Sequence, residues 1–105
     1  MIISKEFILN SLKNYKNRYL DDGVKIIGFF GSYAREDAKD SSDIDILIET
    51  TPLFLKKYRG LKAINRLTFI KNELQSKFGK RVDLVDKSAL LKNNNLYILE
   101  SAIYV

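Results

Sequence analysis

Residues 31–45 read GSYAREDAKDSSDID, and this stretch connects two apolar runs. Val24 to Phe30 precedes it, and Ile44 to Ile48 overlaps its end. A small-residue turn therefore follows one predicted strand, and two carboxylates lie one residue apart on a second predicted strand. Ser32 and Asp43 have ten residues between them, so the pattern is Gly-Ser, ten residues, Asp-x-Asp. We interpret the rest of the chain as scaffold, third ligand or partner surface for this unit.

Asp43 and Asp45 are expected on one face of the second strand, because residues i and i+2 project to the same side at a rise of roughly 3.3 Å per residue. Ile44, Ile46 and Ile48 then face the opposite way, into a core. Two carboxylates at this separation can bind hard cations that share oxygen ligands with substrate phosphates. Paired metal ions about 3.5–4 Å apart stabilise the attacking and leaving oxygens of an in-line displacement.

Gly31 and Ser32 indicate a phosphate site. Glycine lets the backbone approach a ligand closely, serine can cap the following helix, and free N–H groups at a helix start attract phosphate. Arg35 lies three residues later, and its guanidinium suits phosphate oxygens. It can equally pair at the surface with one of three nearby acidic residues, Glu36, Asp37 and Asp40. A phosphate cradle beside metal-binding carboxylates indicates nucleoside triphosphate chemistry.

The length of 105 residues is typical of one domain, and we expect residues 1–105 to form a single domain. A content of 46% hydrophobic and 30% charged residues is typical of a globular, soluble protein. No apolar run approaches the roughly 20 residues that a membrane span needs. Residues 1–6 also lack the basic-then-apolar order of a signal peptide. We therefore expect a cytoplasmic protein with no membrane contact.

The chain contains no cysteine and no histidine, which excludes disulfides, thiolate and imidazole ligands, and the usual general base. Any metal ion must be held by oxygen, and any general base must be Asp, Glu, Lys or Tyr. The formal net charge of +5 suits a nucleic-acid, triphosphate or acidic partner. Lys and Arg are dispersed, without a basic run interleaved with aromatic residues. We therefore favour solvated surface over direct nucleic-acid binding.

Upstream of the motif, a helix is predicted after Ser4, a suitable N-cap. Gly23 is expected to end it in the left-handed conformation. One face of this helix carries apolar or aromatic residues at steps of four, three and four, namely Ile8, Leu12, Tyr15 and Tyr19. The run from Val24 to Phe30 is nearly continuous in its apolar character, which favours an internal strand.

Between the motif and the next strand, Tyr33 to Lys39 is predicted as a short helix that leads into a polar loop. Thr51 with Pro52 is a suitable helix entry, and Gly60 is expected to divide the segment after Pro52 into two helices. The second of these has apolar residues at steps of three, four and four, and Gly79 is expected to end it. Those apolar residues are Leu67, Ile70, Leu74 and Phe78.

Lys80 to Asp86 is predicted as the third strand, and Asp83 is the candidate third carboxylate on it. The alternative for Asp83 is a structural ion pair with the neighbouring Arg81, and Asp86 is the fallback candidate. Ser88 is expected to cap a helical turn. A last helix containing Leu96, Leu99 and Glu100 and a short terminal strand at Ala102 to Val105 complete the chain.

The pattern as a whole resembles the signature of the polymerase-beta-type nucleotidyltransferase superfamily. The length resembles its smallest members, the minimal nucleotidyltransferases, which are often paired with HEPN-domain proteins as antitoxins. Residues 81–85 resemble the strand with the third carboxylate, and residues 98–105 resemble the family's ending, so the likeness extends from about Val24 to the C-terminus. Two residues depart from the pattern. Glu36 stands where these proteins often carry Gly, adding negative charge near the phosphate site, and Asp40 stands where Pro is common.

The resemblance implies an α/β (α+β) polymerase-beta-like palm, in which a small mixed sheet is flanked by helices. It places the third strand beside the Asp-x-Asp strand. Asp83 would then join Asp43 and Asp45 as catalytic residues and as ligands of Mg²⁺, with two ions expected. Three clustered carboxylates repel one another unless a cation neutralises them.

The reaction implied is the transfer of AMP from ATP to an acceptor hydroxyl, with pyrophosphate leaving. ATP phosphates would be bound by Gly31, Ser32 and Arg35. The acceptor implied is a tyrosine of a HEPN-domain toxin, so that the chain would act as a protein adenylyltransferase and antitoxin. Larger enzymes of the superfamily add a helical domain for the nucleobase and the acceptor. This chain has no room for one, so a partner is expected to supply the acceptor surface.

Two other functions stay open from the sequence. The chain can be a non-catalytic binding module that neutralises its partner by forming a stoichiometric complex. Transfer to an RNA end or to a small molecule such as an aminoglycoside is weaker, because it needs recognition elements beyond the palm. Exposed aromatic side chains can serve a partner interface or self-association into a homo-oligomer, and the candidates are Tyr33, Tyr58, Tyr97 and Tyr104.

Overall fold

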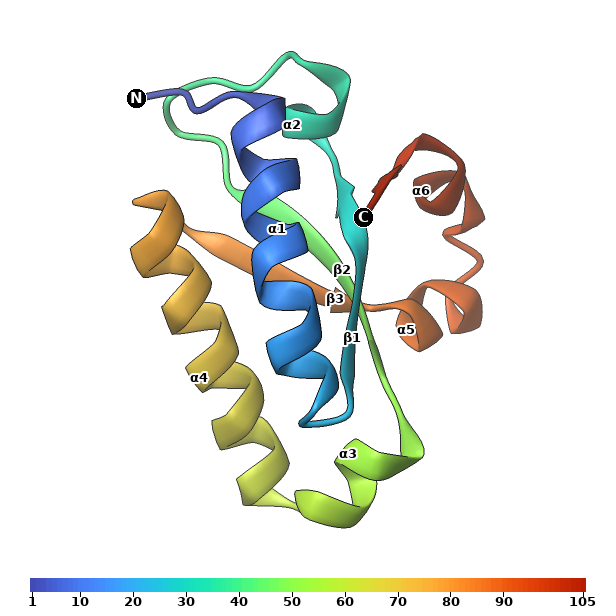
Figure 1. Ribbon diagram of the computed structural model, residues 1–105. Helices are drawn as coiled ribbons and strands as arrows, with labels where there is room; N and C mark the ends of the chain where they lie inside the picture. The colour runs from blue at the N-terminus through green and yellow to red at the C-terminus, as the bar shows by residue number, and fades with distance from the viewer.

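The structure is a computed structural model that describes residues 1–105, and its centre is a four-stranded sheet with helices on both sides (Figure 1). Helices and strands alternate along most of the chain. In chain order the elements are α1 (Lys5–Leu20), β1 (Val24–Phe30), α2 (Ser32–Arg35), β2 (Ile44–Thr50), α3 (Pro52–Lys57), α4 (Leu61–Phe78), β3 (Val82–Asp86), α5 (Lys87–Lys92), α6 (Leu96–Ser101) and β4 (Ile103–Tyr104).

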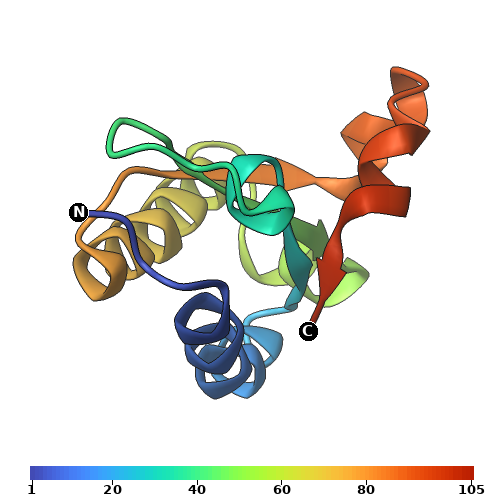
Figure 2. The same cartoon turned by 90° about the horizontal axis from the view of Figure 1, so that it is seen from above.

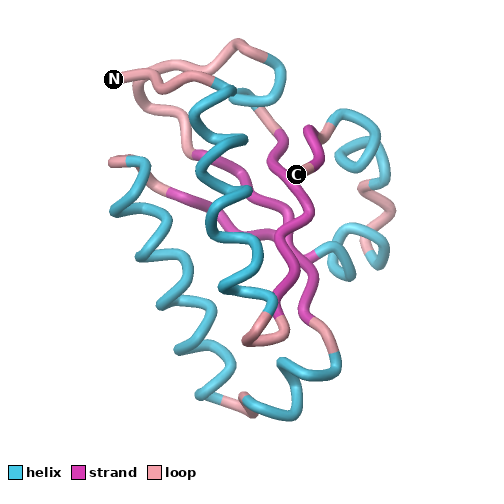
Figure 3. Tube along the Cα trace, viewed as in Figure 1, coloured by secondary structure: helices cyan, strands magenta, loops and turns pink.

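The sheet has the strand order β3-β2-β1-β4. Strands β1 and β2 are antiparallel, β2 and β3 are parallel, and the short β4 pairs antiparallel with β1. The pairing of β1 with β2 shifts its register between Ile26 and Gly28, which marks a bulge. The tube in Figure 3 shows the strands crossing behind the long helices. This arrangement confirms the expected fold, a small mixed sheet flanked by helices.

Helix α1 forms as its sequence predicts. The hydroxyl of Ser4 accepts a hydrogen bond of 3.0 Å from the N–H of Phe7, which satisfies one of the free N–H groups at the helix start. Ile8, Leu12 and Tyr19 are buried against the sheet. Gly23 follows with a φ of +84°, and a Cβ there would lie 2.3 Å from the backbone nitrogen of Phe54. Only glycine fits this turn.

The connection between β2 and β3 also follows its sequence. Pro52 occupies the first turn of α3, and Gly60, which has a positive φ of 58°, separates α3 from α4. The residues Ile70, Leu74 and Phe78 are buried along one face of α4, and Gly79 ends the helix with a φ of 65°. No helix, including the 18-residue α4, has the apolar length that crossing a membrane would require.

Helices α1 and α4 lie side by side on one face of the sheet, as both views show (Figures 1 and 2). The expected inward residues of β2, which are Ile44, Ile46 and Ile48, are buried in this face and belong to a core of 15 buried residues. Leu47 points the other way and is buried as well. Helices α5 and α6 lie on that second side and contact β1, β2 and β3.

The structure differs from the sequence prediction in the segment after the Gly-Ser turn. Helix α2 ends at Arg35 rather than at Lys39, because Glu36 takes a left-handed conformation with φ 64° and ψ 30°. The expectation of an exposed Tyr33 was wrong, since only 3% of its surface is exposed. Its ring packs into the main core, while Tyr97 and Tyr104 are exposed as expected.

A second difference concerns the start of α5. The predicted cap was Ser88, but the cap is Asp86, whose carboxylate accepts from both the N–H and the hydroxyl of Ser88. Asp86 also accepts a hydrogen bond of 2.9 Å from the hydroxyl of Thr50. This carboxylate therefore has a structural role, which removes the support for Asp86 as a fallback third carboxylate.

Candidate functional site

The candidate site lies at the end of the sheet where β1 ends and β2 and β3 begin. Asp45 is the second residue of β2 and faces Asp83, the second residue of β3, in the parallel register. On its other side Asp45 pairs with Phe30, the last residue of β1. Asp43 precedes β2 instead of lying within it. The strand order therefore brings two of the three predicted carboxylates into adjacent positions on neighbouring strands.

The Gly31 turn fits closely against one of these carboxylates. Gly31 has a φ of +75°, and a Cβ built there would lie 2.2 Å from Oδ2 of Asp45. Any other residue would both be strained and collide with the carboxylate. The hydroxyl of Ser32, at the start of α2, makes no hydrogen bond within the chain. The turn thus holds Gly31 against Asp45, and the hydroxyl of Ser32 and the first N–H groups of α2 follow directly after it.

The electrostatics of Asp45 show how crowded this end of the sheet is. Burial raises the pKa of Asp45 to about 6, with further contributions from the charges of Asp83 and Asp43. Arg35 acts in the opposite direction and lowers it. Because the ionised form is disfavoured by its neighbours, a cation placed among these carboxylates would be strongly attracted.

Asp43 and Asp83 differ in their surroundings. Asp43 forms an ion pair of 3.4 Å with Nε of Arg81, whereas Asp83 is exposed and takes part in no ion pair. The alternative considered for Asp83, an ion pair with Arg81, is therefore wrong, since Arg81 pairs with Asp43 instead. The Arg81 side chain is 83% exposed. Breaking this ion pair therefore costs little free energy.

The donor set fits a hard divalent cation, because it consists of carboxylate oxygens alone. The raised pKa of Asp45 shows that its ionised form is disfavoured at this position. A bound cation would stabilise that ionised carboxylate. In this conformation, however, no group of three acidic side chains is arranged to hold one ion. Binding a metal ion through all three would require their side chains to rearrange, and the exposed position of Asp83 and the exposed ion pair of Asp43 with Arg81 permit this.

Arg35 takes the surface position that the sequence left open for it. Its Nε lies 3.2 Å from Oδ2 of Asp37, and both side chains are more than half exposed. The positive charge of Arg35 nevertheless acts to lower the pKa of Asp45. An exposed ion pair of this kind is weak, so the guanidinium can exchange Asp37 for another anion near the Gly31 turn.

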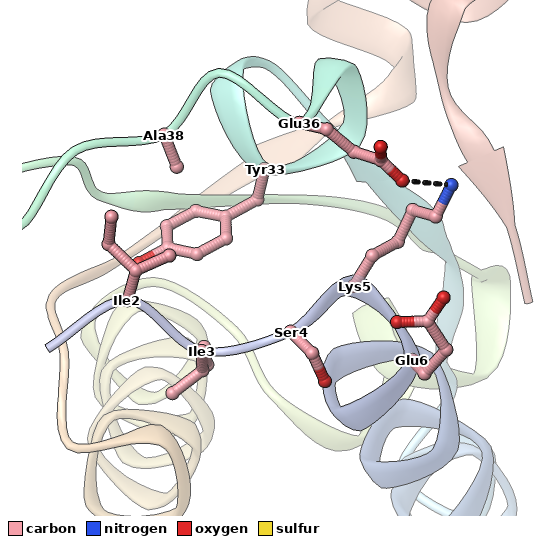
Figure 4. A pocket seen from close by; sticks show the side chains of 8 residues that line it. All are labelled: Ile2, Ile3, Ser4, Lys5, Glu6, Tyr33, Glu36 and Ala38. Carbon is pink, nitrogen blue, oxygen red and sulfur yellow. Dashed lines mark ion pairs between the residues drawn. The ribbon is translucent and has the colours of Figure 1, made fainter.

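Glu36, the acidic departure from the family pattern, is directed toward the start of α1. Its Oε1 lies 2.7 Å from Nζ of Lys5, and this hydrogen bond, together with the charge of Glu36, raises the pKa of Lys5. Lys5 and Glu36 both line a cavity of about 350 Å³, and Figure 4 shows the Tyr33 ring extending across it toward the side chain of Ile2. The charge of Glu36 is therefore neutralised by Lys5. Nothing in the sequence around Lys5 indicates this contact, because it joins residues far apart in the chain.

Comparisons with known proteins find relatives along most of the chain. The family described as nucleotidyltransferase domain matches residues 9–105. Protein adenylyltransferase MntA of Thermococcus cleftensis is 35% identical over 83 residues, which are 79% of this chain and 76% of that protein. A Methanocaldococcus jannaschii protein provisionally named a protein adenylyltransferase is 36% identical over 97 residues, which are 92% of this chain and 85% of its own.

A solved structure, described provisionally as a minimal nucleotidyltransferase, has the same fold. The two superpose with a TM-score of 0.72 and 26% sequence identity, over 98% of this chain and 97% of the other. The likeness therefore covers the sheet, the helices on both of its sides and the end where the acidic residues lie.

Proposed function

The chain belongs to the nucleotidyltransferase domain family, as a minimal nucleotidyltransferase, and from this premise we propose that it transfers AMP from ATP to a hydroxyl group of a partner protein. The observation that carries the proposal is the adjacency of Asp45 and Asp83 beside the Gly31 turn. The names of the two archaeal relatives support a protein as the acceptor. We further propose that residues 1–105 act as one nucleotidyltransferase domain, which the single main core supports.

Asp43, Asp45 and Asp83 would hold Mg²⁺, with two ions in the full site. Mg²⁺ at this position would neutralise phosphate charge and stabilise the attacking and leaving oxygens. The Gly31 backbone, the free hydroxyl of Ser32 and the N–H groups at the start of α2 would bind the β- and γ-phosphates. Arg35 would add a guanidinium to the phosphate oxygens once it leaves its ion pair at the surface.

The reaction would form a bond from the acceptor oxygen to the α-phosphorus of ATP. The bond from that phosphorus to the oxygen bridging the β-phosphate would break, and pyrophosphate would leave with the electron pair. Asp83, exposed on the edge strand, would accept the proton of the acceptor hydroxyl. With no histidine or cysteine in the chain, positioning and electrostatic stabilisation would supply most of the rate enhancement.

The acceptor we propose is a tyrosine of a HEPN-domain toxin in the cytoplasm, so that the chain would act as an antitoxin. The support is the resemblance of the motif and length to the minimal nucleotidyltransferases, together with the protein adenylyltransferase relatives. Modification of the toxin would then neutralise it at less than stoichiometric amounts of this chain.

The test is intact-mass measurement of a HEPN-domain protein after incubation with the chain, ATP and Mg²⁺. We expect the mass of one AMP group to be added, and we expect EDTA to abolish the addition. Asp45→Asn should lower the rate at least about 100-fold, because electrostatic groups at a reacting centre typically contribute 10²–10³. An unmodified HEPN-domain protein in the wild-type reaction would contradict the proposal.

A second candidate function is neutralisation by binding alone, which is favoured by the absence of a preformed three-carboxylate metal group. The variant Asp43→Asn, Asp45→Asn separates the two. Loss of toxin neutralisation in this variant supports catalysis, whereas full neutralisation at equimolar amounts shows that complex formation suffices.

A further inference from the structure

One basic side chain lies among the proposed metal-binding carboxylates, and the proposed reaction gives it no role. In the parallel register of β2 and β3, Asp45 is opposite Asp83. Arg81 lies two residues before Asp83, just as Asp43 lies two residues before Asp45. Residues two apart on a strand project to the same face. The ion pair between Asp43 and Arg81 shows that this alternation continues just before the two strands, so Arg81 shares the face of the three carboxylates.

The backbone holds Arg81 next to Asp43. Ile44 and Val82, the first residues of β2 and β3, are buried in the core on the opposite face. The N–H of Ile44 donates a hydrogen bond of 2.9 Å to the carbonyl oxygen of Arg81. The residues that precede the two strands are therefore neighbours through the main chain, and the closeness of Asp43 and Arg81 does not depend on their side chains alone.

The adjacent lysine carries the same charge but has a different orientation. Nζ of Lys80 donates a hydrogen bond of 3.0 Å to the carbonyl oxygen of Asp40. Nε of Arg81, in contrast, lies 3.4 Å from Oδ1 of Asp43. Of these two neighbouring cations, only Arg81 therefore neutralises a proposed metal ligand.

A polar hollow beside the ion pair gives the guanidinium space to move. The hollow has a volume of about 310 Å³, and no apolar side chain lines it. Asp43 and Arg81 both belong to its lining, together with Ser41, Ser42 and Lys80. The side chain of Arg81 is 83% exposed and that of Asp43 is 40% exposed. Arg81 can therefore leave Asp43 without disturbing the core, and solvent reaches the released guanidinium.

The ion pair sets Arg81 against a free metal ion in two ways. Arg81 occupies the carboxylate of Asp43, and its charge repels any divalent cation that binds close by. A metal ion that is already bound to ATP differs, because the phosphate charges outweigh the charge of the metal ion and the complex is negative overall. Arg81 therefore opposes the binding of the free cation more strongly than the binding of its nucleotide complex.

We propose that Arg81 is a positioning residue that makes the site select a divalent cation already bound to ATP over the free cation. Arg81 acts through Asp43, which it holds in an ion pair until the complex binds. The inference rests on the proposed function, because it takes Asp43 as a metal ligand and ATP as the substrate. Without nucleotide, Asp43 stays neutralised by a side chain of its own protein.

The test measures the binding of Mn²⁺ in two forms, as the free ion and as its complex with an ATP analogue. The analogue has a methylene group between the α- and β-phosphorus atoms, so AMP transfer does not interfere with binding. Electron paramagnetic resonance gives the Kd for free Mn²⁺, and calorimetry gives the Kd for the complex. Arg81→Gln removes the charge, and Arg81→Lys retains it. Lys80→Gln is the matched control, because it removes an equal charge from the adjacent residue.

We expect Arg81→Gln to lower the Kd for free Mn²⁺ at least about fivefold, because it removes both the competing ion pair and the repulsion. The Kd for the Mn²⁺ complex of the analogue should stay within about twofold of the wild type or rise, because the charge of the complex has the opposite sign. Arg81→Lys should resemble the wild type. Lys80→Gln should change both constants by less than about twofold at physiological salt.

Thermal unfolding gives a second readout, since Mn²⁺ should raise the Tm of Arg81→Gln more than that of the wild type. Arg81→Gln and Lys80→Gln with the same Kd for free Mn²⁺ would overturn the inference. Equal lowering of both constants by Arg81→Gln would overturn it as well, because the site would then not distinguish the two forms of the metal ion.

The failures of the two proposals differ in their result. Binding of the Mn²⁺ complex without AMP transfer from ATP to a HEPN-domain protein contradicts the proposed function, and the Arg81 variants then still decide the present inference. If neither the wild type nor Arg81→Gln binds free Mn²⁺, the selection by Arg81 is overturned whether or not AMP is transferred.

Discussion

Asp45 is the residue on which the site depends most closely. It lies between the Gly31 turn, which leaves no space for a Cβ, and the carboxylates of Asp43 and Asp83. Burial and these two charges raise its pKa to about 6. A carboxyl group whose pKa is raised by burial and by neighbouring carboxylates is typical of a functional site.

The pH dependence of stability follows from this shift. Between the ordinary aspartate pKa of about 4 and about 6, the folded protein binds more protons than the unfolded chain, so stability falls as pH rises through this range. Asp45→Asn removes the effect. In EDTA we expect the Asp45→Asn variant to have a higher Tm than the wild type at pH 7.5. At pH 4.5 we expect the difference in Tm between the two proteins to be much smaller.

The control for this prediction is Asp37→Asn, which removes an exposed negative charge from the same protein. It should not reproduce the gain at pH 7.5. A wild type and an Asp45→Asn variant with equal Tm at both pH values would contradict the assignment of the raised pKa to Asp45.

Glu36 provides a second prediction at the scale of one residue. Its left-handed backbone costs a residue with a Cβ about 1–2 kcal/mol relative to glycine. Glu36→Gly and Glu36→Ala both lose the contact with Lys5, so their difference isolates the backbone term. We expect the Gly variant to be about 1 kcal/mol more stable in urea unfolding. Equal stabilities, or a more stable Ala variant, would exclude a left-handed Glu36.

At the scale of the elements, Asp22 connects the end of α1 to α3 and α4. Its Oδ1 accepts a hydrogen bond of 2.8 Å from the hydroxyl of Tyr58, just after α3, and its Oδ2 accepts one of 2.8 Å from Nε of Arg66 on α4. Burial opposes ionisation of Asp22, but these hydrogen bonds prevail and lower its pKa.

Asp22→Asn should therefore lower the free energy of unfolding at pH 7 by about 1.5–3 kcal/mol, the usual contribution of a hydrogen bond to a charged group. Because the folded pKa is lowered, the stabilisation is present above about pH 4 and is lost as pH falls further. The exposed neighbour Asp21 gives the matched control, Asp21→Asn. Urea unfolding at pH 7 and pH 2.5 checks both the loss and its disappearance in acid.

The elements were predictable from the sequence where one local signal decided them. The 3.6-residue spacing of Ile70, Leu74 and Phe78 and the stop at Gly79 define α4 without any knowledge of its neighbours. Helix α2 was not predictable in length, because its end depends on the left-handed Glu36 rather than on periodicity. The start of α5 was misassigned since Asp86 and Ser88 are both good caps, and only their geometry in the fold distinguishes them.

At the scale of the whole molecule, the sequence identified Asp83 as a candidate, but only the pairing of β3 with β2 places it opposite Asp45. The pairing of Arg81 with Asp43 and the contact of Lys5 with Glu36 were not predictable, because each joins segments separated in the chain. Such contacts depend on the tertiary arrangement of the sheet and helices and leave no periodic or motif signal.

The strand order also has a kinetic consequence. The Gly31 turn follows β1, and Asp83 lies two strands away on the edge strand β3, so the proposed positions of the ATP phosphates and of the acceptor hydroxyl are separate and can be filled at the same time. In the proposed reaction the acceptor oxygen attacks the α-phosphorus of ATP directly, so no covalent AMP intermediate forms on the enzyme. Initial rates measured at several fixed acceptor concentrations should therefore give intersecting double-reciprocal lines, the pattern of a reaction that passes through a ternary complex. Parallel double-reciprocal lines would instead indicate that AMP is first transferred covalently to the enzyme and only then to the acceptor.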